Sequence, residues 1–506
     1  MNHTVTIQRL ATGVPGLDEV LGGGLPEFSF NLIAGVPGCG KTTLAHQMMF
    51  AMATPERPAI YFTVLGEPPL KMLRYQQQFT YFDSAAVNRS VRFVNLAQDT
   101  LTGDLNAVLQ RIVTEVQAHN SAFVFVDSFR SVVLASAIEG APHQALQQFV
   151  QQLGVLMTSW EATTFLIGEY FADSDANPVF TVADGLIWLR QNVERNSMVR
   201  KMEIAKMRGQ PSLPGLHTFR ITSAGIQVFA PARAIVTGDD HSGSSALESR
   251  LGMGVPRLDE MLGGGLPRGY SLLVAGPSGS GKSVLAAAFL AEGARCGEAG
   301  VIATFERRPN PFYNRALADL IHSDRVGLVD PQAPDLSIDE IVRLLLDEVH
   351  RLKATRVVID SLSGFELAVA PTFRADFRES LARLVTALAR VGVTVLMTSE
   401  LEDRYTDLRF SPYGTAFLTD AIIVQRYIEV QSELRRVMAV VKVRGSAHSH
   451  ELREFTISTD GIAIAEPLPD YVGLLGGRPT TRQAPERSEL PGGANPLADT
   501  RAASPP

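Results

Sequence analysis

Two short stretches of this sequence combine glycine, lysine and a hydroxyl residue at a spacing that suits the binding of phosphate. Residues 35–42 (GVPGCGKT) and 276–283 (GPSGSGKS) both satisfy the pattern G-x-x-x-x-G-K-[ST]. The glycines let the backbone curl so that its N–H groups face phosphate oxygens, and the helix that follows presents its positive dipole end to the same anion. Each stretch follows a predicted strand, precedes a predicted helix and recurs at one repeat spacing, which disfavours a glycine-rich turn with an accidental lysine.

The side chains of these two loops have separate predicted roles. Lys41 and Lys282 would reach the β- and γ-phosphates of a nucleotide, and the hydroxyls of Thr42 and Ser283 would bind Mg²⁺. The sequence therefore predicts two sites for ATP, with Mg²⁺ as the second cofactor. The predicted nucleotide-binding residues are Gly35, Gly38, Cys39, Gly40, Lys41, Thr42 and Thr43 in the first loop, and Gly276, Gly279, Ser280, Gly281, Lys282 and Ser283 in the second.

Acidic residues at the ends of later apolar runs are candidates for binding the metal and for activating water. Asp127 and Asp360 each end such a run, where P-loop enzymes place a carboxylate that holds Mg²⁺; alternatively, each caps the next helix. Glu67 and Glu306 follow the strand after the P-loop helix, where a carboxylate could orient and deprotonate water. A solvated loop glutamate fits both positions as well. Glu306 is also a candidate metal ligand.

Two pairs of cations recur near the end of each half. Lys206 and Arg208 lie in KMRG, and Lys442 and Arg444 lie in KVRG, both on predicted strands. Residues two apart on a strand share a face, so each pair could stabilise the charge that develops on phosphate, as an arginine finger does. A basic edge strand is the alternative, but it would not require the pair to recur with the same following glycine.

The chain is a tandem duplication with short apolar runs between amphipathic helical stretches. The phrase LDEVLGGGLP at 17–26 returns as LDEMLGGGLP at 258–267, and the P-loops, strand ends and cation pairs repeat in the same order. This alternation predicts an α/β fold with a mostly parallel sheet that carries helices on both faces.

The repeat also sets the predicted domain boundaries. We expect P-loop ATPase domains at residues 1–231 and 250–472. A polar, Gly/Ser-rich segment at 232–249 reads as the linker, and the Pro/Gly-rich segment 473–506, which lacks hydrophobic periodicity, reads as a disordered tail.

Composition narrows the class of protein further. The 506 residues are 45% hydrophobic and 20% charged, and the net charge of −7 counts against nucleic acid as a partner. The two cysteines, Cys39 and Cys296, exclude a disulfide framework and fit a reducing cytoplasm. The sequence has no secretory signal pattern at its start and no run of about eighteen apolar residues that could cross a membrane.

Together these motifs give the chain a family resemblance. It resembles the KaiC proteins, the double-domain branch of the RecA/DnaB-like ATPases, over roughly residues 10–470, most specifically in the stretch 418–458 (LTDAIIVQRYIEVQSELRRVMAVVKVRGSAHSHELREFTIS). The resemblance implies tandem RecA-like domains in a homohexamer of two stacked rings, with ATP at the subunit interfaces. It implies that the two cation pairs reach the neighbour's nucleotide, assisted by Arg200 and Arg436, and that a KaiB-like or other signalling protein is the partner.

The sequence also departs from the family pattern. A usual pair of adjacent glutamates is reduced to Gly66-Glu67 in the first half and to Glu306-Arg307 in the second. In clock members of the family, an adjacent Ser-Thr pair before the TD motif receives phosphate, whereas this chain has Ala416-Phe417 there, flanked by Thr415 and Thr419. Autophosphorylation would therefore need an altered site.

Four hypotheses follow from these observations. The first is a hexameric, regulatory ATPase whose nucleotide state controls the binding of a partner, and the second is a serine/threonine autokinase acting through the second domain. A DNA-handling RecA-like motor is the third, against which the acidic balance counts. The fourth is a nucleotide-binding scaffold with little turnover, suggested by the incomplete glutamate pairs.

Overall fold

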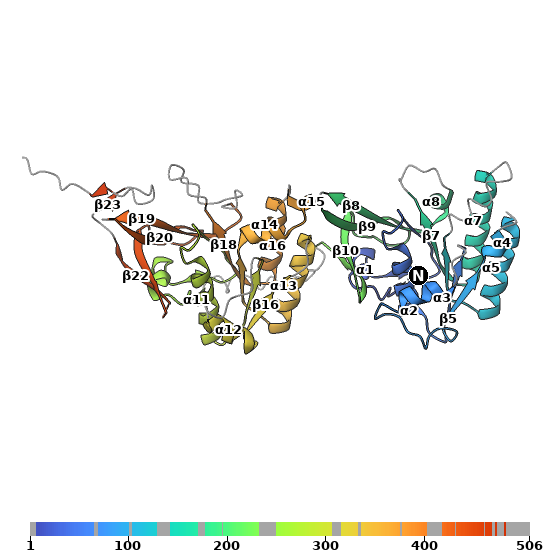
Figure 1. Ribbon diagram of the computed structural model, residues 1–506, viewed down its shortest axis with the longest axis horizontal. Helices are drawn as coiled ribbons and strands as arrows, with labels where there is room; N and C mark the ends of the chain where they lie inside the picture. Colours follow the sequence, from blue (N-terminus) through green and yellow to red (C-terminus); the bar gives the residue numbers. More distant parts are fainter. Residues whose placement is uncertain are drawn as a thin grey trace, which may run out of the picture.

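The computed structural model consists of two lobes that follow one another along its long axis (Figure 1). The described residues are 7–64, 69–100, 104–128, 142–170, 178–194, 196–231, 249–305, 315–331, 335–374, 377–401, 417–430, 432–459, 461–467, 471–472 and 480–481. Among the helices in these ranges, none combines the length and apolar character needed to cross a bilayer.

Each lobe is built on a nine-stranded sheet with the same strand order. In the first lobe this order is β11 (Gly225–Phe229), β10 (Leu216–Thr222), β9 (Ser197–Met207), β8 (Gly185–Glu194), β3 (Phe30–Gly35), β7 (Thr163–Glu169), β6 (Phe123–Asp127), β4 (Ala59–Thr63) and β5 (Val91–Asn95). The strands from β8 to β5 are parallel, and β9 to β11 extend the sheet as antiparallel strands.

The second lobe repeats this arrangement strand for strand. Its order is β22 (Gly461–Pro467), β21 (Arg453–Ser458), β20 (Glu433–Val443), β19 (Ala421–Val430), β14 (Ser271–Gly276), β18 (Thr394–Glu400), β17 (Arg356–Asp360), β15 (Gly300–Thr304) and β16 (Val326–Val329). The predicted α/β class with a mostly parallel sheet is confirmed.

Helices cover both faces of each sheet because the central strands are apolar on both sides. Ile33 of β3 packs with α1 (Leu17–Leu21) and α2 (Lys41–Met52), whereas Leu32 packs with α5 (Leu105–His119) and α7 (Pro142–Ser159). In β14, Leu272 packs with α11 (Lys282–Arg295), and Leu273 packs with α13 (Ile338–Leu352), α14 (Leu362–Ala368) and α16 (Phe377–Arg390). The shorter helices are α3 (Pro69–Gln76), α4 (Ala97–Thr100), α8 (Pro178–Val182), α10 (Pro256–Met261), α12 (Arg315–His322) and α15 (Pro371–Arg374).

The repeated phrase forms a tight connection before each P-loop strand. In the first lobe it makes α1, a three-glycine turn and β2 (Leu25–Pro26), which pairs with β1 (Arg9–Leu10). Gly24 and its counterpart Gly265 have φ of 115° and 104°, and a methyl group on either would lie 2.4 Å or 2.6 Å from a backbone oxygen. The glycines recur because this turn leaves no room for a side chain. In the second lobe, β12 (Arg250–Leu251) pairs with β13 (Leu266–Pro267) in the same way.

Polar contacts join the two lobes at the antiparallel edge of the first sheet. Thr218 of β10 donates a hydrogen bond to Ser337, at the start of α13, over 2.8 Å, and Arg220 forms an ion pair with Glu340. Thr372 of α15 donates to Glu194, at the end of β8, over 2.9 Å. An ion pair between Glu19 of α1 and Arg343 of α13, and the ammonium of Lys201 in β9 over the ring of Phe373 in α15, add to these contacts. The described side-chain contacts between the lobes therefore involve α1 and strands β8 to β10 on one side and α13 and α15 on the other.

The predicted linker and tail lie almost wholly outside the described residues. Of the segment 232–249 the structure describes residue 249, and of 473–506 it describes β24 (Thr480–Thr481). This strand pairs antiparallel with β23 (Tyr471–Val472). The domain boundaries remain predictions.

Candidate functional site: two nucleotide-binding loops

The two nucleotide-binding loops turn at glycines with backbone angles that other residues avoid. Gly40 and Gly281 have φ of 108° and 104°, and each directly precedes the helix that begins with the loop lysine. A methyl group on Gly40 would lie 2.8 Å from Cδ1 of Ile221 in β10, and one on Gly281 would lie 2.5 Å from Cδ1 of Ile457 in β21. The antiparallel edge of each sheet therefore packs directly against the P-loop.

Both loop lysines are buried and hydrogen-bonded to the carbonyl groups of their own loop. Lys41 Nζ donates to the Val36 carbonyl over 2.9 Å. Lys282 Nζ donates to the carbonyls of Gly276 and Pro277 over 2.9 and 2.8 Å. The ammonium groups are thus held inside the two turns, where phosphate binds in P-loop proteins.

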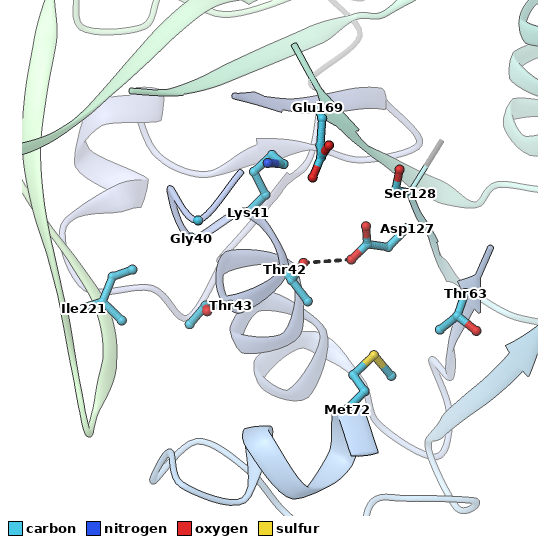
Figure 2. Close-up of a pocket in the computed structure, with 11 residues that line it drawn as sticks. Gly40, Lys41, Thr42, Thr43, Thr63, Met72, Asp127, Ser128, Glu169 and Ile221 are labelled. Carbon is cyan, nitrogen blue, oxygen red and sulfur yellow. Dashed lines mark hydrogen bonds between the residues drawn. The ribbon is translucent and has the colours of Figure 1, made fainter. Parts of the chain in front are cut away.

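A cavity of about 330 Å³ opens in front of the first loop (Figure 2). Loop and helix residues form one side of it, and the ends of β4, β6 and β7 form another. The lining residues are Gly38, Gly40, Lys41, Thr42, Thr43, Thr63, Met72, Asp127, Ser128, Glu169 and Ile221. The loop residues predicted to bind a nucleotide therefore border a hollow together with the carboxylate predicted to hold its metal.

The predicted metal ligands of the first lobe lie in direct contact. Thr42 Oγ1 donates a hydrogen bond to Asp127 Oδ2 over 2.9 Å (Figure 2). Burial raises the pKa of the Asp127 carboxyl, while hydrogen bonds from Tyr61 and Thr42 and the charge of Lys41 act in the opposite direction. Desolvation favours the neutral acid, and these donors favour the carboxylate that a cation requires.

Tyr61 is the donor that sequence reasoning missed. Its hydroxyl donates to Asp127 Oδ2 over 2.7 Å from the neighbouring strand β4. The ring is fully buried, stacks on Phe125 with centroids 6.0 Å apart, and lies 4.5 Å from the ring of His46. This packing fixes the hydroxyl, and because burial raises the pKa of Tyr61 well above its usual value, the hydroxyl stays protonated and can donate.

Glu169 is a second residue that the sequence analysis did not single out. It ends β7, lines the first cavity and lies between Lys41 and Ser128 in the view of Figure 2. Its charge contributes to the raised pKa of Asp127, so two carboxylates converge on the loop. A sequence signal existed, because the matched strands TTFLIGE and TVLMTSE both end in glutamate. The predicted water-activating residues, Glu67 and Glu306, lie outside the described residues.

The second lobe supports its carboxylate differently. Asp360 Oδ1 accepts a hydrogen bond from Thr398 of β18, the strand on the other side of β17 from β15. Ser280, in the place of Cys39, donates to Gln425 over 3.1 Å. Lys282 and Ser283 begin α11 as Lys41 and Thr42 begin α2. The frame is the same in both lobes, but different residues supply the polar contacts.

The oxygen-rich set at the first loop suits Mg²⁺. The ion prefers oxygen ligands and keeps several waters or phosphate oxygens, so one or two protein groups suffice. Thr42 and Asp127 supply such groups, and Glu169 adds a third oxygen donor at the same cavity. Throughout the described residues, no three His, Cys, Asp or Glu side chains gather into a cluster that could hold a metal by themselves.

The cation pairs lie far from the P-loop of their own lobe. Arg208 follows β9 directly, and its backbone N–H donates to the Asp184 carbonyl over 2.9 Å, beside Phe30 at the start of β3. The P-loop follows the other end of β3, roughly 17 Å away at the rise of a strand. Arg444 occupies the same place beside β14. Neither arginine can serve the loop of its own lobe.

The residues predicted to assist the cation pairs lie further along the same strands. Arg200 is in β9 and borders a cavity of about 200 Å³ between the lobes, together with Arg220 and Glu340. Six residues separate it from Lys206, roughly 20 Å along an extended strand. Arg436 is at the equivalent place in β20, with its guanidinium 5.5 Å from the ring centre of Tyr427. Their joint action with the cation pairs remains a prediction.

The positions aligned with the phosphate acceptors offer little to a kinase. Phe417 is half exposed and has no hydroxyl, and Thr419 is completely buried. Ala416 and Thr415 lie outside the described residues. Of the flanking hydroxyls, that of Thr419 is therefore enclosed, and a role for Thr415 stays a prediction.

Tandem nine-stranded α/β sheets with a P-loop on the central strand of each define a tandem RecA-like P-loop ATPase. Comparison with known proteins agrees with this class. The family model "ATPase: KaiC" matches residues 10–233 and 251–468. The protein belongs to the KaiC ATPase family, and it is an ATPase that binds nucleotide.

Similar curated proteins match almost the whole chain. The "Circadian clock oscillator protein KaiC" of Picosynechococcus sp. is 28% identical over 500 residues, covering 96% of this chain and 95% of that protein. The "Circadian clock oscillator protein KaiC 1" of Synechocystis sp. and the KaiC protein of Synechococcus elongatus are each 26% identical over 498 residues, covering 96% of this chain and 94% of the relative.

Proposed function

We propose that this protein hydrolyses Mg-ATP at both P-loops as a hexamer of two stacked rings, and that its nucleotide state controls the binding of a signalling protein. One observation carries the proposal. Arg208 and Arg444 lie at the opposite end of the sheet from the P-loop of their lobe, with more than half of each side chain exposed. A neighbouring chain is the natural recipient of such an arginine.

The residues at the first loop divide the chemistry among them. Lys41 and the loop N–H groups bind the phosphates, Thr42 and Asp127 hold Mg²⁺, and Glu169 or Glu67 orients the attacking water. When bound, Mg²⁺ would neutralise charge on the phosphate oxygens. Arg208 of the next chain would stabilise the charge that develops on the transferred phosphoryl group, and Lys206, two residues earlier in β9, would add a second cation.

A regulatory role fits the relatives, whose names describe circadian clock oscillators. KaiB-like proteins are therefore the first partner class to test, and cytoplasmic residence is expected for such a system. Autophosphorylation is a second activity of the proposal, with Thr415 as the hydroxyl to monitor. Intact-mass analysis after incubation with Mg-ATP measures it directly.

The test of the function is steady-state ATP turnover, with oligomer mass measured on the same samples. Lys41→Ala and Lys282→Ala should each remove the turnover of one lobe, and the double variant should lose at least about 100-fold of the total, because the loop lysine stabilises the transferred charge. Arg295→Ala, at the exposed far end of α11, is the control and should retain turnover. Turnover that survives in the double variant would refute the proposal.

A further inference from the structure

One aspartate in each lobe contacts the arginine that the proposed function assigns to the neighbouring nucleotide. Asp184 Oδ1 accepts from Arg208 Nη1 over 3.1 Å, and Asp420 Oδ1 accepts from Arg444 Nη1 over the same 3.1 Å. Neither aspartate was among the residues that sequence analysis singled out. The contact occurs independently in the two lobes.

The second oxygen of each aspartate binds the strand that leads to the P-loop. Asp184 Oδ2 accepts from the Phe30 N–H over 3.0 Å, and Asp420 Oδ2 accepts from the Ser271 N–H over 3.0 Å. Phe30 and Ser271 are the first residues of β3 and β14, which end at the first glycine of each loop. Each carboxylate therefore joins the arginine to the strand that carries the P-loop of the same lobe.

Backbone hydrogen bonds strengthen the same junction. The Arg208 N–H donates to the Asp184 carbonyl over 2.9 Å, and the Asp184 N–H donates to the Phe30 carbonyl over 2.7 Å. The matching distances for Arg444, Asp420 and Ser271 are 2.8 and 2.9 Å. In each lobe, the aspartate thus binds both the backbone N–H and the guanidinium of the arginine.

Folding stability alone does not explain this ion pair. The Arg208 and Asp184 side chains are 59% and 32% exposed, and those of Arg444 and Asp420 are 58% and 24% exposed. Ion pairs with this degree of exposure contribute little to the free energy of folding, because water screens them. What the contact does provide is direction, since it limits the rotamers of a long side chain that would otherwise sample many.

The neighbouring lysine and the helix end complete the orientation. Lys206 Nζ donates to the Thr181 carbonyl at the end of α8 over 3.1 Å, and Arg208 Nη2 lies 3.5 Å from the same oxygen. In the second lobe, Lys442 Nζ donates to the Thr419 carbonyl over 2.6 Å. Burial lowers the pKa of both lysines, as does the adjacent arginine, whereas the aspartate raises it. The aspartate therefore also helps the lysine to stay charged.

We propose that Asp184 and Asp420 are positioning residues that aim Arg208 and Arg444 at the nucleotide of the adjacent chain. Through β3 and β14, each also ties that arginine to the P-loop strand of its own lobe. This inference rests on the proposed function, in which the arginines act across a subunit interface. The aspartates touch no reacting group themselves and act through the arginine.

A double-mutant cycle in the first lobe tests the inference, with Lys282→Ala as the common background so that turnover reports this lobe. Arg208→Ala should lower kcat by about 10³-fold, the scale of an arginine finger. Asp184→Asn should lower kcat by roughly 10- to 100-fold at nearly unchanged KM, because the lost orientation acts in the transition state. Asparagine keeps an oxygen that can accept from the Phe30 N–H.

The decisive measurement is kcat of the variant that combines Asp184→Asn with Arg208→Ala. If Asp184 acts through Arg208, then Asp184→Asn has no further effect on kcat once Arg208 is alanine. Glu203→Gln is the control, since it breaks the ion pair of Glu203 with Arg190 between the same strands, β8 and β9, without touching Arg208, and kcat should not change.

Two results would overturn the inference, and they are distinguishable from each other. If Asp184→Asn lowers kcat equally with and without Arg208, the aspartate has a structural role and the finger assignment survives. If Arg208→Ala itself leaves kcat unchanged while Lys41→Ala abolishes turnover, then the finger assignment fails and the positioning role fails with it. The same cycle with Asp420 and Arg444, in a Lys41→Ala background, repeats the test in the second lobe.

Discussion

The two lobes share one frame and differ in the polar groups that support the loop carboxylate. Asp127 accepts from Tyr61 on one neighbouring strand, whereas Asp360 accepts from Thr398 on the other. The equivalent of Tyr61 in the second lobe is Ile302, which has no donor, and the equivalent of Thr398 in the first lobe is Ile167. In both lobes a side-chain hydroxyl donates to the partly buried carboxylate beside the P-loop, but the neighbouring strand that provides this hydroxyl differs.

The same contrast appears behind the loop. Cys39 packs in the apolar core of the first lobe, and its counterpart Ser280 donates to Gln425 in the second. His46 on α2 is completely buried against Tyr61, and the equivalent residue on α11 is Ala287. Duplication has therefore kept the loop geometry and the arginine junction while the residues between them diverged, so the two lobes can be tuned separately.

The largest expected difference between the lobes is sensitivity to acid. Burial lowers the pKa of His46 from 6.5 to about 4, with the nearby Gln76 acting in the opposite direction. In the unfolded chain, the imidazole of His46 takes up a proton near pH 6.5. In the folded lobe, the same imidazole takes up a proton only near pH 4. The stability that neutral His46 provides is thus complete above pH 6.5 and is lost as the pH falls toward 4, by about 3 kcal/mol in all.

Hydrogen exchange at pH 7 and pH 5, corrected for intrinsic rates, measures this effect by lobe. At pH 5, which is about 1.5 units below the unfolded pKa of His46, the protection of the α2 amides should fall roughly 30-fold. The protection of the α11 amides should fall less. His46→Leu should remove the difference. Equal losses in both helices, or a loss that persists in His46→Leu, would contradict the assignment to His46.

A smaller difference is expected from Tyr61. Tyr61→Phe removes one hydrogen bond to a partly buried carboxylate, so the pKa of Asp127 should rise further and protons should compete better with Mg²⁺. We expect roughly tenfold lower turnover of the first lobe at neutral pH, the lower end for a hydrogen bond to a charged group, measured in the Lys282→Ala background. Part of the loss should be recovered at higher Mg²⁺ concentration.

The matched control for Tyr61 comes from the other lobe. Ile302→Val, in the Lys41→Ala background, changes the equivalent core position without touching a carboxylate and should leave turnover within about twofold. Thr398→Val in the same background should reproduce the tenfold loss, because it removes the donor to Asp360. If Tyr61→Phe is as active as its parent, the hydroxyl does not support Asp127.

Much of this fold could be predicted from the sequence, because its signals are local. Apolar runs such as 122–127 predict buried parallel strands, and the P-loop pattern fixes a strand, a turn and a helix within about twenty residues. The repeated order of landmarks then predicts two similar sheets. The order of their strands required the three-dimensional structure.

The sequence motifs predicted which residues form the site. They did not predict the hydrogen bonds between side chains of neighbouring strands. Thr42 and Asp127 are 85 residues apart, yet their positions in the motifs suffice to predict that both bind the same Mg²⁺. The donors Tyr61 and Thr398 could not be found that way, because their roles depend on which strands are neighbours and on which face each side chain lies. Asp184 and Asp420 offered a weak signal, since each directly precedes the corresponding strand of its own repeat, β8 or β19.

In the proposed ring, the P-loop of one chain binds each nucleotide and the arginine of the next chain completes the site. The most direct measurement mixes two variants in a Lys282→Ala background, Asp127→Asn with an intact Arg208 and Arg208→Ala with an intact Asp127, after each has been shown to be inactive alone. Each interface of the ring joins the P-loop of one chain to the arginine of the next. In a random equal mixture, roughly a quarter of the interfaces therefore combine an intact Asp127 with an intact Arg208. We predict that the mixture recovers about that fraction of the turnover of the Lys282→Ala parent. Turnover that stays at the sum of the two separate variants would show that the arginine does not act across the interface.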